Sequence, residues 1–177
     1  MTPYFFQSDL SAYNSATEET LLEFTATQHG GILRASFPTY TRDAYNNGYD
    51  QTRRISIGLN GDPDTATVST DYFNTVSISG YSTKSSGGTG DGFKFYFIAA
   101  IFSGEEGTGS TTASFKSADS SWAYANFDAK VEANKLLTVR IGTSFISLEQ
   151  AILNLEVSHV LFDTCCVPLQ YCNYYLL

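Results

Sequence analysis

The stretch from Phe93 to Phe102 reads FKFYFIAAIF and is the most apolar strand-like run in the sequence. Successive residues of a β-strand point to opposite faces, so each face of this run can be considered separately. One face carries Phe93, Phe95, Phe97, Ala99 and Ile101, and the other carries Tyr96, Ile98, Ala100 and Phe102. A strand that is apolar on both faces is buried on both. We therefore expect 93–102 to be a central strand of a β-sandwich.

Alternation of apolar and polar residues recurs through the rest of the chain. Gly, Pro and Asn interrupt it at turns such as His29–Gly31, Asn60–Pro63 and Ala133–Asn134, and in Gly-rich stretches at 81–92 and 104–110. Short strands at this spacing are typical of an all-β fold, an antiparallel β-sandwich. The alternation predicts strands at 22–27, 33–37, 55–59, 65–69, 75–79, 123–127 and 137–141.

One helix is expected near the C-terminus. Ser147 is a favourable N-cap residue, and Gln150 three positions later would complete a capping box. Leu148, Ile152 and Leu155 then recur at helical spacing. We predict a helix from Leu148 to about Ser158, which would lead from the sandwich toward another domain.

Composition favours a single folded domain and limits its partners. The 177 residues are 42% apolar and 15% aromatic, which excludes global disorder, and no collagen or heptad repeat occurs. The net charge of −8 and the lack of basic clusters beyond Arg53–Arg54, whose side chains would lie on opposite strand faces, argue against nucleic acid and anionic membranes as partners. No stretch of 18 apolar residues and no signal peptide are visible, so we expect no membrane span, and the localisation stays open.

Histidine and cysteine offer few candidates for a metal or catalytic site. His29 falls in a Gly-flanked turn and His159 at the end of the predicted helix, and neither has another ligand at metal-binding spacing. No G-x-S-x-G motif is present. Cys165, Cys166 and Cys172 match no zinc spacing. We interpret the histidines as structural or solvent-exposed and the thiols as incidental, with a redox or metal role as the alternative.

Three further patterns resemble ligand sites but have simpler explanations. Gly87–Gly90 lacks the Lys-Ser/Thr of a phosphate-binding loop and precedes a strand. Glu105–Glu106 and Asp62–Asp64 could supply carboxylates for glycoside hydrolysis or calcium binding, but no further ligand at suitable spacing accompanies them. Trp122 and Tyr124 could stack on sugar rings, although a core position is the simpler expectation for Trp122. We therefore assign no catalytic, cofactor-binding or metal-binding residue to this chain.

Several segments, in order along the chain, carry motifs of a known family. Glu23–Thr27 and Ser36–Pro38 resemble "ELTAT…G…R-Y-T-F-P", and Ile78–Tyr81 followed by Phe95–Ala99 resembles "I-x-G-Y … Y-F-x-A". The most specific match is Val139–Leu155, which resembles "V-R-x-G-x-S-F-I-S-x-E-Q-A-x-x-N-L". These are motifs of glycoside hydrolase family 92, in its N-terminal β-sandwich domain. The resemblance covers the chain from about residue 2 to residue 156.

This resemblance implies a set of functional expectations. Members of family 92 are calcium-dependent, inverting exo-α-mannosidases that act on α-linked mannose of N-glycans and related mannans. They join an N-terminal β-sandwich to a larger (α/α)6 barrel through a helical linker, and the barrel supplies the general acid, the general base and most calcium ligands. This chain resembles only the sandwich and the start of the linker, so no site residue is carried over. The expected partners are that barrel and, in the intact enzyme, a mannose-containing glycan.

The resemblance also divides the chain into parts. We expect a partial, supersandwich-like β-sandwich domain at 1–146, a linker helix at 147–159 and an aberrant tail at 160–177. The start lies inside the family's sandwich, so early strands are missing. The tail follows neither the family pattern nor a helical or strand period, and our hypothesis is a read-through intron or a shifted frame. The parent enzyme would be secreted or in the secretory pathway.

Two functions therefore follow as predictions. In the first, the chain is a truncated, non-catalytic N-terminal domain of a calcium-dependent exo-α-mannosidase and binds no cofactor itself. In the second, it is a free-standing carbohydrate-binding or interaction β-sandwich. A wide apolar patch rimmed by polar residues would favour the first function, because a second domain would cover it. A planar, exposed aromatic platform would favour the second.

Overall fold

The computed structural model describes residues 5–11, 19–37, 52–58, 66–72, 75–83, 92–104, 114–119, 122–128 and 131–165. These residues form two β-sheets, a short 3-10 helix (Glu132–Lys135) and one α-helix, α1 (Leu148–Cys165). The strands are β1 (Phe5–Ser11), β2 (Glu19–Thr27), β3 (Gly30–Ser36), β4 (Thr52–Gly58), β5 (Ala66–Tyr72), β6 (Thr75–Ser82), β7 (Phe95–Ser103), β8 (Ser114–Asp119), β9 (Trp122–Asp128) and β10 (Leu136–Ser144).

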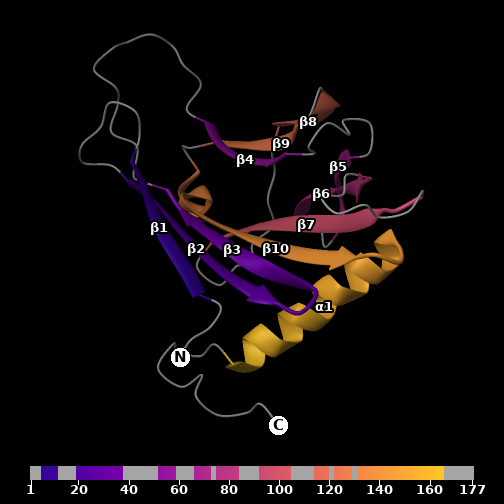
Figure 1. The fold of residues 1–177 in the computed structure, drawn as a ribbon. Coiled ribbons are helices and arrows are strands. Elements are labelled where there is room, and N and C mark those ends of the chain that lie inside the picture. The colour runs from indigo at the N-terminus through magenta and orange to yellow at the C-terminus, as the bar shows by residue number, and fades with distance from the viewer. Residues whose placement is uncertain are drawn as a thin grey trace.

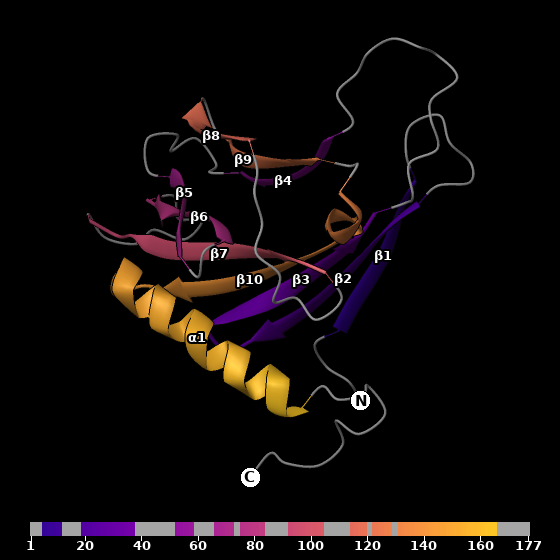
Figure 2. The ribbon, with the colours of Figure 1, turned by 180° about the vertical axis from the view of Figure 1, so that it is seen from behind.

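The two sheets differ in size, and the larger one lies between the smaller sheet and the helix. Seven strands form the large sheet in the order β1-β2-β3-β10-β7-β6-β5, and three form the small sheet in the order β4-β9-β8. Every neighbouring pair in both sheets is antiparallel. The small sheet covers one face of the large sheet, and α1 covers the other (Figures 1 and 2). The predicted all-β sandwich with a C-terminal helix is confirmed.

This arrangement creates two apolar cores, one on each face of the large sheet. The core between the sheets is made of Ala35, Ile55, Val76, Ile78, Phe97, Ala99, Ile101, Ala123, Ala125, Phe127, Leu137 and Val139. The core under the helix is smaller and consists of Ile98, Ala100, Phe102, Ala151 and Leu155. Burial of this apolar surface on both faces is the main force that holds the three layers together.

β7 contributes to both cores and confirms the expectation for 93–102. Phe97, Ala99 and Ile101 lie in the core between the sheets, whereas Ile98 and Ala100 lie in the core under α1. The strand is inside the large sheet, because it pairs with β10 on one side and β6 on the other. The double-sided apolar pattern therefore identified both the strand and its central position.

Two strands and one short helix were not predicted. β1 reads FFQSDLS and β8 reads SFKSAD, and neither sequence alternates regularly between apolar and polar residues. Both are outer strands, and each pairs with one neighbour, β2 and β9 respectively. The turn expected around Ala133–Asn134 is a 3-10 helix, in which Asn134 Nδ2 donates a hydrogen bond to the Asp128 carbonyl oxygen at 2.9 Å.

The helix is longer than predicted. The expected end at about Ser158 is wrong, since α1 continues to Cys165. No glycine or proline occurs between Leu148 and Val167, so nothing in the sequence stops the helix before Pro168. The first part of the segment expected to be an aberrant tail is thus helical, and residues 166–177 lie outside the described residues.

Candidate functional site

The corner between β10 and α1 carries the most specific sequence motif, and hydrogen bonds define its shape. Ser144 Oγ accepts a hydrogen bond from the Ile146 backbone N–H at 2.9 Å. Ser147 Oγ accepts one from the Gln150 backbone N–H at 3.2 Å, so Ser147 caps α1 as predicted. The other half of the predicted capping box, a hydrogen bond from the Ser147 backbone N–H to Gln150 Oε1, is not found among the described residues. The Gln150 side chain donates from Nε2 to Asn154 Oδ1 at 3.0 Å.

The first turns of α1 lie very close to β10. A methyl group at Gly142 would overlap the carbonyl oxygen of Ala151 and would lie 2.7 Å from Cβ of Leu155. Both helix residues are fully buried. Asn154 Nδ2 also donates a hydrogen bond to the Thr143 carbonyl oxygen at 2.8 Å, which fixes the rotation of the helix on the sheet. The motif residues therefore dock the helix, and their contacts explain their identity without any catalytic role.

A second contact joins α1 to β5, the edge strand of the large sheet that lies at the other end from β1. Tyr72, at the end of β5, donates a hydrogen bond from its hydroxyl group to Glu156 Oε1 at 3.3 Å. Burial of the Tyr72 phenol raises its pKa, and the negative charge of Glu156 and this hydrogen bond raise the pKa further. At the start of the helix, hydrogen bonds from its own backbone N–H and from the Ser147 hydroxyl lower the pKa of Glu149.

Large apolar side chains are exposed at the corner and along the outer side of the helix. The four residues concerned, which we call the apolar row, are Phe145 (70% exposed), Ile146 (77%), Leu153 (52%) and Val157 (61%). Leu153 and Val157 are one helical turn apart and therefore lie on the same side of α1. Glu149 and Glu156, both exposed, lie beside the row on the same helix. The row thus has two exposed side chains on α1, with carboxylates beside them, and two at the corner, where Phe145 lies against Phe93 and Phe95.

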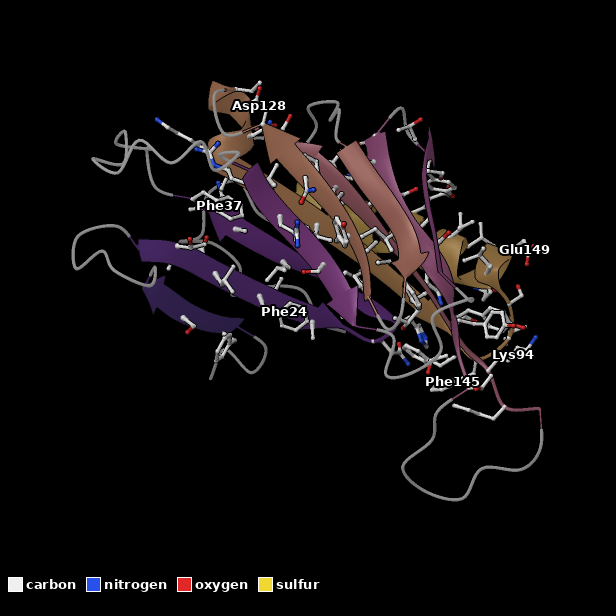
Figure 3. All side chains as sticks on the ribbon, turned by 90° about the horizontal axis from the view of Figure 1, so that it is seen from above. Phe24, Phe37, Lys94, Asp128, Phe145 and Glu149 are labelled. Atoms are coloured by element: carbon white, nitrogen blue, oxygen red, sulfur yellow. The ribbon has the colours of Figure 1, made fainter. Side chains whose placement is uncertain are left out.

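Aromatic rings surround the corner, but they do not form a flat platform. The Phe145 ring lies 5.7 Å from that of Phe93 and 5.4 Å from that of Phe95, at interplanar angles of 41° and 57°. Tyr81 and Tyr96 are tilted by 56°, and Lys94 Nζ lies 4.2 Å above the Tyr81 ring. Figure 3 shows Phe145 and Lys94 at the same end of the sheet. Tilted rings of this kind pack against one another and present edges to the surroundings.

His29 and Tyr124 both make contacts that stabilise the fold. His29 lies in the exposed turn between β2 and β3, and its carbonyl oxygen accepts hydrogen bonds from the Thr143 backbone N–H at 2.8 Å and from the Thr143 hydroxyl at 3.0 Å. Tyr124 is half-buried, and the Arg54 guanidinium lies 4.2 Å above its ring, where a sugar would have to stack. Arg54 is exposed and Arg53 is buried, as expected for neighbours on opposite strand faces.

The remaining candidates lie outside the part of the chain that the structure describes. These are Gly87–Gly90, Glu105–Glu106, Asp62–Asp64, Cys166, Cys172 and the side chains of Trp122, His159 and Cys165. Among the described residues, no three His, Cys, Asp or Glu side chains lie close enough together to hold a metal ion. Within the same residues, no helix has both the length and the hydropathy needed to cross a membrane.

Comparison with known proteins shows a likeness to solved structures. No family model matches the chain, and no curated protein matches it either. Among solved structures, the chain is similar to a family GH92 inverting mannosidase from Bacteroides thetaiotaomicron, with a TM-score of 0.57 and 20% sequence identity. The match covers 88% of this chain and 19% of the mannosidase chain, so this chain spans about a fifth of that protein's length. The chain therefore has a GH92-like sandwich fold.

Proposed function

We propose that this chain is a non-catalytic β-sandwich domain of a GH92-type α-mannosidase, in which it supports a separate catalytic domain. The apolar row on α1 carries this proposal. Exposed apolar surface with a charged rim is characteristic of a surface that another domain covers. The likeness to one fifth of a GH92 mannosidase supports a partner domain of that family. We propose that this partner is the (α/α)6 barrel that would follow the linker helix.

The way α1 is anchored supports the same function. A helix that only completed the sandwich would bury its apolar side chains and expose polar ones. α1 instead buries Ala151 and Leu155 on the sheet and still exposes Leu153 and Val157 on its outer side. Helix docking through Gly142 and Asn154 holds this outer side in a fixed position. Such a rigid, two-sided helix is suited to join two domains.

The alternative function, a free-standing carbohydrate-binding module, has less support. Sugar-binding platforms present aromatic rings whose faces are flat and free. At the β10–α1 corner the Phe145 ring is tilted by 41° relative to the Phe93 ring and by 57° relative to the Phe95 ring. The one ring that the sequence suggested as a platform and that the structure describes, Tyr124, is covered by Arg54. These contacts favour packing over sugar recognition.

The catalytic part of the proposal is tested by an activity assay. Inverting hydrolysis needs an acid and a base with carboxyl groups roughly 6.5–9.5 Å apart, and a calcium site needs about six to eight oxygen ligands. We propose that both are supplied by the barrel. The purified chain should then release no mannose from α-1,2-mannobiose at neutral pH, with or without calcium. Calcium-dependent turnover that is lost on mutation of a carboxylate in this chain would contradict the proposal.

The docking part is tested by site-specific cross-linking. A photoreactive residue at position 153 should cross-link, in cells that express the gene, to a polypeptide that contains a GH92-type catalytic domain. The same residue at position 56, an exposed position on β4, is the matched control and should give no such product. Cross-links from position 153 only to unrelated proteins would contradict the proposal. Specific binding of methyl α-mannoside that is lost in Phe145→Ala would instead support the carbohydrate-binding module.

A further inference from the structure

The outer strand β1 presents an open edge of the large sheet. Among the described residues it pairs with β2 alone. An edge strand exposes a row of backbone N–H and C=O groups that can pair with another chain, and proteins usually protect such edges with lysines, prolines, bulges or a covering element. β1 and β2 extend beyond the small sheet at one side of the molecule (Figure 3). Whether the open edge of β1 can pair with a strand of another chain therefore depends on whether it has such protection.

The three other sheet edges each carry a protective feature. β5 has an irregular register between Ser69 and Tyr72, and β8 contacts it from the small sheet. β8 has a second irregularity, between Lys116 and Asp119, and includes a lysine. β4 carries the exposed Arg54. Bulges and positive charges of this kind prevent strand-to-strand association at these edges.

The described residues show none of these features at β1. The strand contains no lysine, arginine or proline, and its register with β2 is unbroken over all 7 residues. Asp9 is its single charged residue. Phe6 is 60% exposed, and it pairs with Phe24 of β2 on the face that is directed toward the small sheet. A regular edge with one charge and an exposed aromatic ring is well suited to pair with an extended strand.

We propose that β1 is a homodimer interface, in which the strand pairs antiparallel with β1 of a second copy about a two-fold axis at Ser8. The sequence of the strand supports this register, which uses its full length. It places Phe5 opposite Ser11, Phe6 opposite Leu10, Gln7 opposite Asp9 and Ser8 opposite itself.

This register is favourable in charge and in apolar contacts. It opposes Asp9 to an uncharged glutamine, whereas a two-fold axis at Asp9 would oppose two carboxylates. Phe6 gains a leucine as its cross-strand neighbour, twice in each dimer because the interface is symmetric. The pairing adds roughly six to eight backbone hydrogen bonds. A second copy would therefore pair with the whole edge that the described residues leave open.

The test uses charge at the symmetry axis. The purified full-length chain should be dimeric by sedimentation velocity, and Ser8→Lys should be monomeric, because two ammonium groups would then face each other. Ser8→Glu should also be monomeric, whereas an equimolar mixture of the two variants should form a heterodimer. Ser56→Lys, which adds the same charge at an exposed position on β4, is the matched control and should remain dimeric.

Each result of this experiment decides the matter. Far-UV circular dichroism verifies that every variant is folded before its mass is measured. A monomeric parent chain, a dimer that survives Ser8→Lys, or charged variants that do not recombine would overturn the proposal. Association through the apolar row on α1 would appear as a dimer that Ser8→Lys leaves unchanged. Growth into open-ended oligomers would also contradict it, because two-fold pairing of one edge closes at two copies.

Discussion

Replacement of Gly142 by alanine tests whether close approach of α1 to β10 determines the sequence of the motif. The added Cβ would overlap the Ala151 carbonyl oxygen and lie 2.7 Å from Leu155 Cβ and 2.8 Å from Leu155 N. An ordinary carbon–carbon contact is about 3.5 Å, so the helix would have to move away by roughly 0.8 Å. The atoms it meets are backbone atoms and a Cβ, which no rotamer change can displace.

The expected cost follows from overpacking. Extra methyl groups in a tightly packed interface typically cost about 1–3 kcal/mol. Alanine restricts the unfolded chain more than glycine does, which offsets only about 0.4–1 kcal/mol. We therefore expect Gly142→Ala to lower the free energy of unfolding by about 1–2 kcal/mol. Because Ala151 and Leu155 would lose their close contacts with the sheet, the amides of α1 should also exchange faster with solvent.

Urea denaturation measures the stability loss, and hydrogen exchange measures the helix. The matched control is Gly92→Ala, where a Cβ meets nothing within 4 Å but the backbone has φ of +87°. That control should cost about 1 kcal/mol through backbone strain and should leave exchange in α1 unchanged. If Gly142→Ala were as stable as the parent chain, with α1 equally protected, close helix approach would not be the reason for this glycine.

Two further outcomes are expected from the contacts of α1. Ser147→Ala removes the cap that accepts the Gln150 N–H and should destabilise the chain by about 1 kcal/mol, measured by urea denaturation against Ser56→Ala as an exposed control. Glu156→Gln should lower the raised pKa of Tyr72 in an ultraviolet titration without restoring the ordinary value, because burial, the largest cause, remains. A raised pKa in the folded state means that folding favours the neutral Tyr72 phenol. The contribution of Tyr72 to the free energy of unfolding is therefore present below the ordinary tyrosine pKa and is lost as the pH rises through the folded-state pKa. A Tyr72 titration midpoint that is unchanged in Glu156→Gln would contradict the role of Glu156.

The strands were predictable where burial imposes a pattern on the sequence. β7, with both faces in a core, and strands such as β10, with Leu137 and Val139 directed between the sheets, follow directly from their alternation. β1 and β8 escaped prediction because FFQSDLS and SFKSAD do not alternate regularly, whereas the outer strand β4 was predicted from the alternation of Ile55 and Ile57 with polar residues. The order of strands in the sheets could not be predicted from the sequence pattern either, because pairing between distant segments depends on tertiary contacts.

The helix shows a different limit. Its start was predictable, because the Ser147 cap is a local hydrogen bond between residues three positions apart. The capping box was only half right: Ser147 accepts the Gln150 backbone N–H, while the Gln150 side chain donates to Asn154, one turn further along. The end was misplaced because the prediction relied on a loss of apolar periodicity, while the residues after Ser158 still lack any helix breaker. The helix therefore continues from Ser158 to Cys165 because no residue in this segment breaks it, although the apolar periodicity has ended.

The site of strongest sequence resemblance is also a site of very close packing. Gly142 admits the helix, Ala151 and Leu155 fill the contact, Asn154 fixes the rotation, and Ser147 begins the helix. All five act on the docking of α1, and none converges with a second titratable group toward a common point. A motif of this kind can persist in a chain that has no catalytic site, because the geometry of the helix on the sheet requires it. The resemblance at this corner therefore reflects a shared architecture, the docking of a helix on the large sheet.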